Sequence, residues 1–155
     1  MDGSAGGAAS RVVFVCAKNG GKSQMAAGLM RRAAGDGVEV DSAGTRPGTA
    51  VNAVSAQAMA EVGVDITDQV PQQLTRGMVE GADLVVVLGR EAVVDPALLD
   101  GTDTRVVTWE TDEPSDRGIE GLERMRLVRD DIDARVTALA SELTGRRLSG
   151  GDVRA

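Results

Sequence analysis

The stretch VFVCAKNGGKSQMA, residues 13–26, passes from an apolar run through a glycine-rich turn into residues that favour a helix. This succession predicts a buried β-strand, a tight loop and an α-helix, which is the unit that builds parallel α/β sheets. Ligands of such sheets bind outside the carboxyl ends of the strands. The one cysteine of the chain, Cys16, stands at that point, so the stretch predicts both the fold and the position of the site.

Strands and helices alternate along the rest of the chain. Continuous apolar runs typical of strands buried on both faces lie at 12–15, 84–88 and 106–109. A shorter, half-exposed strand is expected at 38–42, with helices at 23–34 and 51–62 and a long final helix whose apolar stripe runs from Met125 to Leu143. These elements predict an α/β three-layer sandwich in which a four-stranded parallel sheet is flanked by helices.

Length and charge narrow the classes of function. The 155 residues suit a single α/β domain at 11–144 between two flexible ends, 1–10 and 145–155. No apolar run reaches the ~18 residues that a transmembrane helix needs, and the first residues lack a signal-peptide pattern, so we expect a cytoplasmic protein without a membrane partner. A net charge of −7 disfavours nucleic acid as a partner. The oligomeric state is not predictable from these features.

Missing residue types exclude whole classes of chemistry. The chain has no histidine and one cysteine, so it cannot form a Ser-His-Asp triad, a Cys-His pair or a zinc site of His and Cys ligands. We therefore expect no metal and no bound cofactor. An internal disulfide is also impossible, so any redox partner of Cys16 must come from another molecule.

The glycine-rich loop has two interpretations. A nucleotide-binding loop has the pattern G-x-x-x-x-G-K-[ST], which Gly21, Lys22 and Ser23 satisfy, but Cys16 occupies the position of its first glycine. The run at 82–89, the best candidate for the strand that would carry an acidic magnesium ligand, ends in glycine. The other interpretation is a cysteine nucleophile followed, after five residues, by a cation and a hydroxyl.

Physical chemistry favours the cysteine interpretation. A sulfur at a helix N-terminus, surrounded by backbone N–H groups and near Lys22, is stabilised as the nucleophilic thiolate. Ser23 is expected to donate a hydrogen bond to it, and Asn19 to brace the loop. The only lysines of the chain, Lys18 and Lys22, both lie here. The loop residues expected to bind an anion are Ala17, Lys18, Asn19, Gly20 and Gly21. The plain alternative is that Cys16 is a small buried apolar residue.

Four motifs together carry a resemblance to a known family. They are CAKNGGKSQMA at 16–26, DSAGT at 41–45, DEP at 112–114 and ERMRLVRD at 123–130. With these motifs the chain resembles the low-molecular-weight tyrosine phosphatase superfamily, and within it the thiol-dependent arsenate reductases, most of all the mycothiol-dependent kind. The resemblance implies a four-stranded parallel sheet, a catalytic Cys16, an anion-binding loop at 17–23 and an acid-bearing loop near Pro114.

Three departures from the broader superfamily distinguish this chain. The loop closes with Lys22 where arginine is usual, and an ammonium cannot clamp two oxygens as a planar guanidinium does. The chain has no tyrosine, and its one phenylalanine lies within a predicted strand, so a phosphotyrosine ring has little to stack on. The thioredoxin-linked reductases carry further cysteines that this chain lacks. A low-molecular-weight thiol is therefore the expected second reactant.

The resemblance implies an arsenate-mycothiol transferase. The Cys16 thiolate attacks arsenate held by the loop, mycothiol then takes over the arsenic as an arseno-mycothiol adduct, and a separate mycoredoxin-type protein reduces that adduct to arsenite. Lys22 and Ser23 assist the cysteine. The alternatives are a low-molecular-weight phosphatase of weak activity and a non-catalytic module that binds an anion or a nucleotide.

Supporting roles follow from the same motifs. The residue before Pro114 is the expected acid, which assigns Glu113 to this role, with Asp112 as a second candidate; the alternative is a merely solvated acidic loop. Ser42 is expected to hydrogen-bond Asn19 or its loop. Three arginines of the last helix could face the pocket, but the neighbouring acids favour a solvated, ion-paired face for them; they are Arg124, Arg126 and Arg129.

Overall fold

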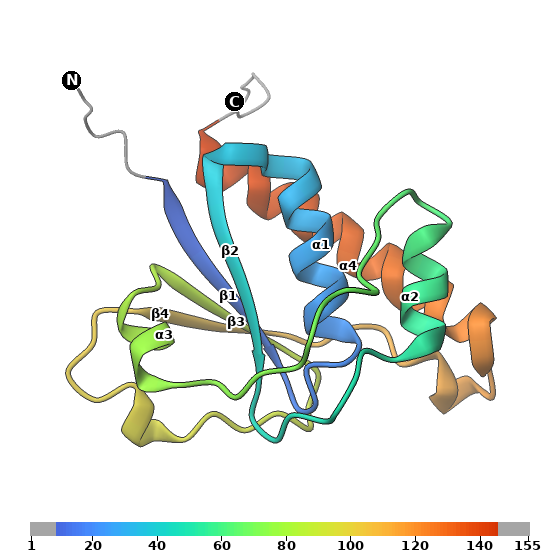
Figure 1. The fold of residues 1–155 in the computed structure, drawn as a ribbon, viewed down its shortest axis with the longest axis horizontal. Helices are drawn as coiled ribbons and strands as arrows, with labels where there is room; N and C mark the ends of the chain where they lie inside the picture. Colours follow the sequence, from blue (N-terminus) through green and yellow to red (C-terminus); the bar gives the residue numbers. More distant parts are fainter. Residues whose placement is uncertain (1–8, 146–155) are drawn as a thin grey trace.

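The computed structural model describes residues 9–145 and shows the predicted α/β architecture (Figure 1). Its sheet has the order β2-β1-β3-β4, and every neighbouring pair is parallel. Cys16 lies at the carboxyl end of β1, one of the two central strands. The strands are β1 (Ser10–Cys16), β2 (Val38–Gly44), β3 (Leu84–Leu88) and β4 (Arg105–Trp109).

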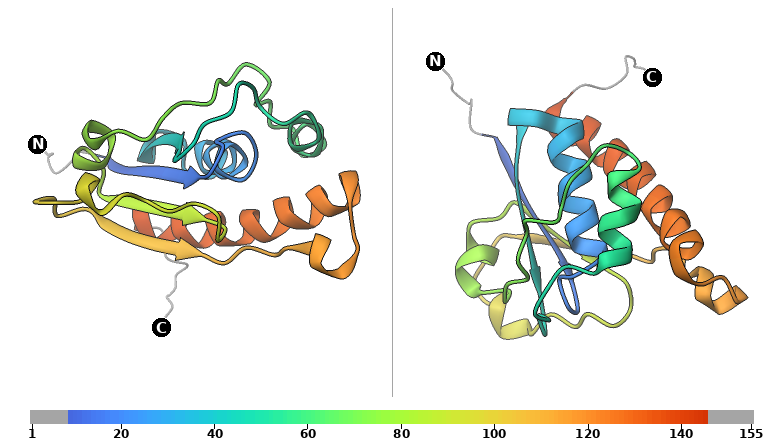
Figure 2. Two further views of the ribbon diagram at one scale, coloured as in Figure 1. Left: turned by 90° about the horizontal axis from the view of Figure 1, so that it is seen from below. Right: turned by 45° about the vertical axis from the view of Figure 1, so that its right-hand side comes forward.

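Helices cover the two faces of the sheet unequally. One face packs on α1, α2 and α4, which lie side by side (Figures 1 and 2), while the other is covered by the short α3 and by loops. The helices are α1 (Lys22–Ala34), α2 (Ala53–Ala60), α3 (Arg76–Glu80) and α4 (Gly121–Thr144). Three 3-10 turns occur at η1 (Gly35–Gly37), η2 (Pro96–Leu98) and η3 (Pro114–Arg117).

The two central strands divide their side chains between these faces. Val12 and Phe14 of β1 face the layer of α1 and α4, whereas Val13 and Val15 face α3. All four side chains are at most 1% exposed, because a central parallel strand is covered on both sides. The core is aliphatic apart from Phe14, whose ring lies 5.9 Å from that of Trp109 between centroids.

The prediction that residues 106–109 form a strand buried on both faces is wrong in its burial. β4 is an edge strand, and only Val107 and Trp109 pack on the core, while Val106 is 39% exposed. An apolar run alone does not reveal that one face lacks a covering element. The helix α3 was not predicted; its five residues are too few for a periodic pattern, and Thr75 caps them by accepting the N–H of Met78.

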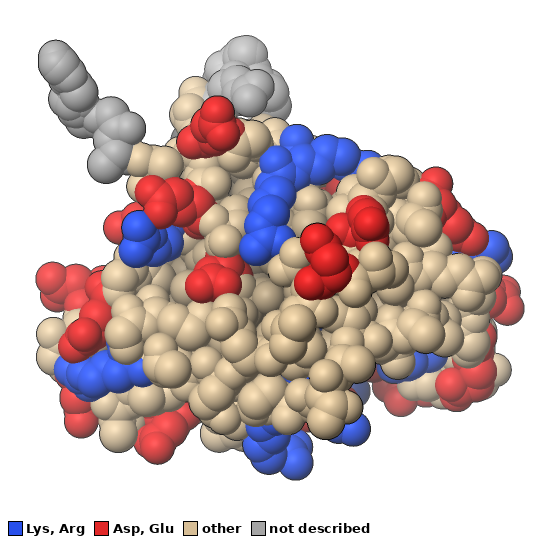
Figure 3. Space-filling model, in the orientation of Figure 1, with Lys and Arg blue, Asp and Glu red and all other residues tan. Residues whose placement is uncertain are grey.

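The expected flexible ends, 1–10 and 145–155, fall almost entirely outside the described residues, and β1 begins at Ser10. Within residues 9–145 no helix combines the length and the apolar character needed to cross a bilayer. On the face drawn in Figure 3, the basic side chains of the described residues lie among acidic ones and do not gather in one broad patch.

Candidate active site

Cys16 lies in a buried pocket of hydrogen-bond donors. Cys16 as a whole is 7% exposed. Its sulfur accepts the N–H of Asn19 at 3.2 Å and lies 3.0 Å from the Ser23 hydroxyl. That hydroxyl oxygen already accepts a hydrogen bond from Asn19 Nδ2 at 2.7 Å, so its own proton is free to point at the sulfur. The sulfur thus has the Asn19 N–H as a donor and lies within hydrogen-bond distance of the Ser23 hydroxyl, which is the contact expected for Ser23.

Asn19 is the residue that holds the loop in shape. It is fully buried and adopts φ 53°, a left-handed conformation that asparagine tolerates better than most residues. Its side-chain oxygen accepts the backbone N–H of Gln72 at 3.0 Å, while its backbone oxygen accepts Gln24 Nε2 at 3.2 Å. The bracing role predicted for Asn19 is thus realised, with partners from three parts of the chain.

The carbonyl groups of the loop are turned outward. Those of Cys16, Ala17, Lys18 and Gly20 accept backbone N–H groups from the segment 45–52, at 2.7 to 3.1 Å. Because the N–H and C=O of a peptide lie in one plane and point in opposite directions, outward carbonyl groups leave the N–H groups of the loop facing its interior, as in other backbone anion sites. The end of β2 comes close enough that a Cβ on Gly44 would lie 2.7 Å from the Ala17 oxygen.

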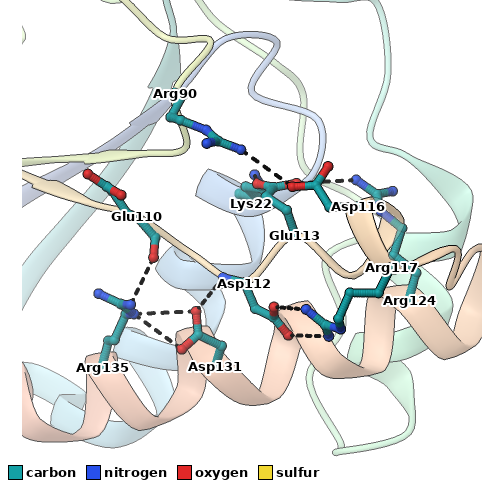
Figure 4. A network of polar contacts seen from close by, with 10 residues as sticks. All are labelled: Lys22, Arg90, Glu110, Asp112, Glu113, Asp116, Arg117, Arg124, Asp131 and Arg135. Atoms are coloured by element: carbon teal, nitrogen blue, oxygen red, sulfur yellow. Dashed lines mark hydrogen bonds and ion pairs between the residues drawn. The ribbon is translucent and has the colours of Figure 1, made fainter.

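A carboxylate and two cations lie beside this loop. Lys22, the first residue of α1, forms an ion pair through its Nζ with Oε2 of Glu113 (Figure 4). The other oxygen of Glu113 lies 3.9 Å from Arg124 Nη2. The side chains of Lys22 and Glu113 are 15% and 16% exposed, so both are largely withdrawn from solvent. The structure therefore brings the expected acid to the expected cation.

Asp112 points elsewhere. Its two oxygens accept hydrogen bonds from Arg117 at 2.8 and 3.2 Å, and these bonds hold the pKa of Asp112 below its usual value (Figure 4). Arg117 therefore holds Asp112, whereas Glu113 is held at Lys22, the residue that follows the loop. The geometry separates the two candidate acids and favours Glu113.

Ser42 does not fill the role expected of it. Among the described residues, Gln72 makes the contact with the Asn19 side chain that was expected of Ser42. Gln72 also donates from Nε2 to the backbone oxygen of Ser42 at 2.9 Å. Ser42 thus supports the loop indirectly, through its backbone. Gln72 lies 53 residues from Asn19 in the sequence and carries no local pattern that could have revealed it.

The arginines of α4 divide into two groups. Arg126 and Arg129 bind Glu61 at 2.6 and 2.9 Å, so the expected ion pairing is present. The expected solvated position is wrong for Arg129, which is 9% exposed and donates to the Ala58 backbone oxygen at 2.8 Å because it packs between α4 and α2. Arg124 instead lines a cleft of about 260 Å³ that adjoins the loop, which was the less favoured of the two positions expected for it. Its position next to Met125, where the apolar stripe of α4 begins, is the one signal that it borders the buried face. Within residues 9–145, His, Cys, Asp and Glu side chains form no group of three suited to a metal ion.

The fold and the loop together define a cysteine-based oxyanion site at the carboxyl edge of a parallel sheet, with a cation and a carboxyl beside it. Residues 11–148 match the family model described as low molecular weight phosphotyrosine protein phosphatase, and the chain belongs to this family. This membership disfavours the nucleotide-loop interpretation of the same residues.

Several relatives and solved structures carry a narrower description. The chain is 35% identical over 135 residues to an arsenate reductase of Halalkalibacterium halodurans, covering 83% of this chain and 94% of the relative. A solved arsenate reductase in a phosphate binding state has a TM-score of 0.71 and 26% identity, covering 86% of this chain and 98% of that one. A thioredoxin-dependent arsenate reductase of Corynebacterium glutamicum has a TM-score of 0.70 and 26% identity, covering 94% and 67%.

Proposed function

We propose that this protein is a thiol-dependent arsenate reductase, and more narrowly an arsenate-mycothiol transferase. The observation that carries the proposal is the geometry at Cys16: a sulfur with two donors, at the base of an N–H-lined loop, beside an ion-paired Lys22 and Glu113. The relatives described as arsenate reductases support the substrate. The absence of a second cysteine from the sequence supports the thiol.

The first step is displacement at arsenic. The Cys16 thiolate attacks arsenate in the loop, a sulfur–arsenic bond forms, and an arsenic–oxygen bond breaks. The departing hydroxide takes a proton and leaves as water, and Glu113 is the carboxyl placed to supply that proton. An oxyanion bound beside Lys22 competes with Glu113 for the ammonium, and this competition releases the carboxyl toward the leaving oxygen.

The second step returns the cysteine. Mycothiol forms a new sulfur–arsenic bond, the bond from Cys16 breaks, and the proton of the incoming thiol passes to the Glu113 carboxylate. The arsenic remains pentavalent in both steps, so the electrons for arsenite must come afterwards, from a mycoredoxin-type protein acting on the adduct. An internal disulfide cannot supply them, because Cys16 is the only cysteine.

Features of the site favour arsenate over an aryl phosphate. The residues that line the cleft include no aromatic ring, and Phe14 is fully buried between the sheet and the helix layer that contains α1. Lys22 provides one point charge where a guanidinium would hold two oxygens of a phosphoryl group. A phosphotyrosine ring would gain little from stacking, and a compact oxyanion loses nothing by its absence.

The test is arsenate turnover with purified protein and three reductant systems. Mycothiol with a mycoredoxin should sustain arsenite formation, glutathione and thioredoxin should sustain little, and Cys16→Ser should abolish it. Turnover with thioredoxin alone would overturn the argument from the missing cysteines. Thiol-independent hydrolysis of an aryl phosphate, faster than arsenate turnover, would favour the phosphatase alternative.

A further inference from the structure

The cleft beside the loop differs in charge from the rest of the molecule. The chain has a net charge of −7, yet the residues that line this cleft include three cations and no carboxylate. They are Lys18, Gly20, Gly21, Lys22, Gly48, Ala50, Asn52, Ser55, Arg124, Met125 and Val128. Such a lining suits a ligand that is rich in hydrogen-bond acceptors.

Arg124 has a donor that the protein leaves unused. Its Nε is buried and has no hydrogen-bond partner among the described residues, while its Nη2 lies 3.9 Å from Oε1 of Glu113. Figure 4 shows Arg124 in one network of polar contacts with Lys22 and Glu113. A buried N–H without an acceptor is unfavourable, and a ligand oxygen in the cleft would satisfy it.

The floor of the cleft is less polar than its rim. Met125 and Val128 are at most 9% exposed, and the Ser55 hydroxyl lies 3.5 Å from the Met125 sulfur. An apolar floor below cationic donors fits a molecule with both C–H surface and oxygen acceptors. Inorganic arsenate has no C–H surface and is already held by the loop, so the floor is not explained by the oxyanion.

The position of the cleft suits the second reactant. It adjoins the loop at Gly20, Gly21 and Lys22, while Cys16 is not among its lining residues. A ligand in the cleft therefore lies beside the oxyanion and does not replace it. Arsenic bound to Cys16 must be attacked from outside the loop, and holding the attacking sulfur near it raises the rate by proximity.

We infer that this cleft binds the sulfur-bearing end of a low-molecular-weight thiol, with Lys18 and Arg124 donating hydrogen bonds to the carbonyl oxygens of that end. The inference rests on the proposed function and deepens it by placing the second substrate. The volume of about 260 Å³ is at the small end for a ligand site, so the cleft takes the sulfur-bearing end of mycothiol and leaves the rest outside.

Steady-state kinetics separates this role from a role in binding arsenate. In a ping-pong mechanism, kcat/KM for arsenate reports the first half-reaction, and kcat/KM for mycothiol reports the second. Arg124→Ala should lower kcat/KM for mycothiol about tenfold more than kcat/KM for arsenate, as loss of one charge-assisted hydrogen bond predicts. The control is Arg126→Ala on the same helix, which removes a partner of Glu61 and should leave the ratio of the two unchanged.

A second variant tests the cleft without removing a charge. Ala50 lies on the exposed rim, so Ala50→Trp should obstruct the cleft without disturbing the core. It should again reduce kcat/KM for mycothiol more than that for arsenate. Equal losses in both half-reactions, or a loss confined to arsenate, would overturn the inference and assign Arg124 to the oxyanion.

Binding provides a readout that does not depend on turnover. Cys16→Ser protein should bind S-methyl mycothiol, which cannot attack arsenic, and Arg124→Ala or Ala50→Trp in that background should weaken the binding about tenfold by calorimetry. No binding to Cys16→Ser, or binding that both further substitutions leave intact, overturns the inference. Intact binding without any arsenate turnover would instead uphold the cleft and remove the proposed function.

Discussion

The two sides of the site are built in different ways. The loop side is a network of buried, neutral hydrogen bonds in which Asn19 and Ser23 are fully buried and lie within a few residues of Cys16. The acid side is held by charge: Glu113 and Arg124 come from the far end of the chain and keep 16% and 30% of their side chains exposed. The first side has buried side chains that lie close together in the sequence, although Gln72 and the segment 45–52 also hold the loop. The second side is assembled from distant parts of the chain and is partly exposed to solvent.

This difference corresponds to different tasks. Backbone donors stabilise an oxyanion only when they are already in position, and a buried network keeps them there without rearrangement during the reaction. An ion pair can exchange partners, so Glu113 can release Lys22 when an oxyanion arrives and bind it again when the product leaves. We expect substitutions on the loop side to be more damaging than those on the acid side.

The largest effect is expected at Asn19. Asn19→Ala removes the acceptor of Gln72 N–H and the donor to Ser23, so the loop loses its brace and the Ser23 proton its orientation. We expect arsenate turnover to fall about 1000-fold, and the free energy of unfolding to fall by about 1–3 kcal/mol because a buried N–H is left unpaired. Kinetics and denaturant unfolding measure the two effects.

A glycine variant separates the backbone from the side chain. Asn19→Gly adopts φ 53° without strain, whereas alanine pays about 1–2 kcal/mol for it, so the difference in stability between the two variants measures the strain. Both should lose most of the turnover. Near-normal activity of Asn19→Gly would show that the network around this side chain is not what positions the donors.

The next effect concerns the acid. Glu113→Gln should reduce turnover about 100-fold, because the amide cannot donate the proton that a carboxyl supplies to the leaving oxygen. Asp112→Asn is the matched control. Asp112 is bound to Arg117 and its pKa is lowered, so this variant should keep most of the activity and lose a little stability. A larger loss in Asp112→Asn would reverse the assignment of the acid.

A smaller effect is expected at the cation. Lys22→Arg keeps the charge but supplies a fork that can hold two oxygens, so hydrolysis of an aryl phosphate should rise several-fold relative to arsenate turnover. Both activities are measured on one preparation, with the wild type as reference. An equal change in the two would mean that the lysine does not discriminate between the oxyanions, and that selectivity resides in the acid side.

The loop side was predictable because its information is local. Cys16, Asn19, Lys22 and Ser23 lie within eight residues, and a strand followed by glycines and a helix fixes where that stretch sits in a parallel sheet. The four strands and the long helix were predictable for the same reason, since each strand is a short apolar run and the helix has its own apolar stripe. The order of the strands leaves Cys16 where the stretch 13–26 predicts it, at the carboxyl end of a buried strand.

The acid side was only partly predictable because its partners meet through the fold. Glu113 was named from its place before Pro114, but its separation from Asp112 depends on Arg117, which captures the neighbouring carboxyl. Arg124 was expected on a solvated face, because sequence neighbours do not show which arginine of a helix borders a cleft. The exposure of Val106 was not predicted for a similar reason. The fold decides which strand lies at the edge of the sheet, and the sequence of that strand alone does not show it.

The smallest effect tests whether α4, which carries Arg124, is also fastened by charge. Hydrogen bonds from Arg126 and then Arg129 lower the pKa of Glu61 to about 2 from 4.5, so the unfolded chain binds the proton more readily than the folded one. Stability from this carboxylate is therefore complete above about pH 4.5 and is lost as pH falls toward 2. Glu61→Gln should lower the melting temperature by a few degrees at pH 7, with the difference from wild type shrinking as the pH falls from 4.5 toward 2.

The control is Glu80→Gln, which removes an exposed ion pair with Arg76. It should lower the melting temperature less, because solvent screens that pair. If the deficit in melting temperature of Glu61→Gln instead persisted unchanged at pH 2, packing of α2 against α4 would hold the helix. The contrast between a neutral loop side and a charged acid side would then apply to Glu113 and would not extend along α4.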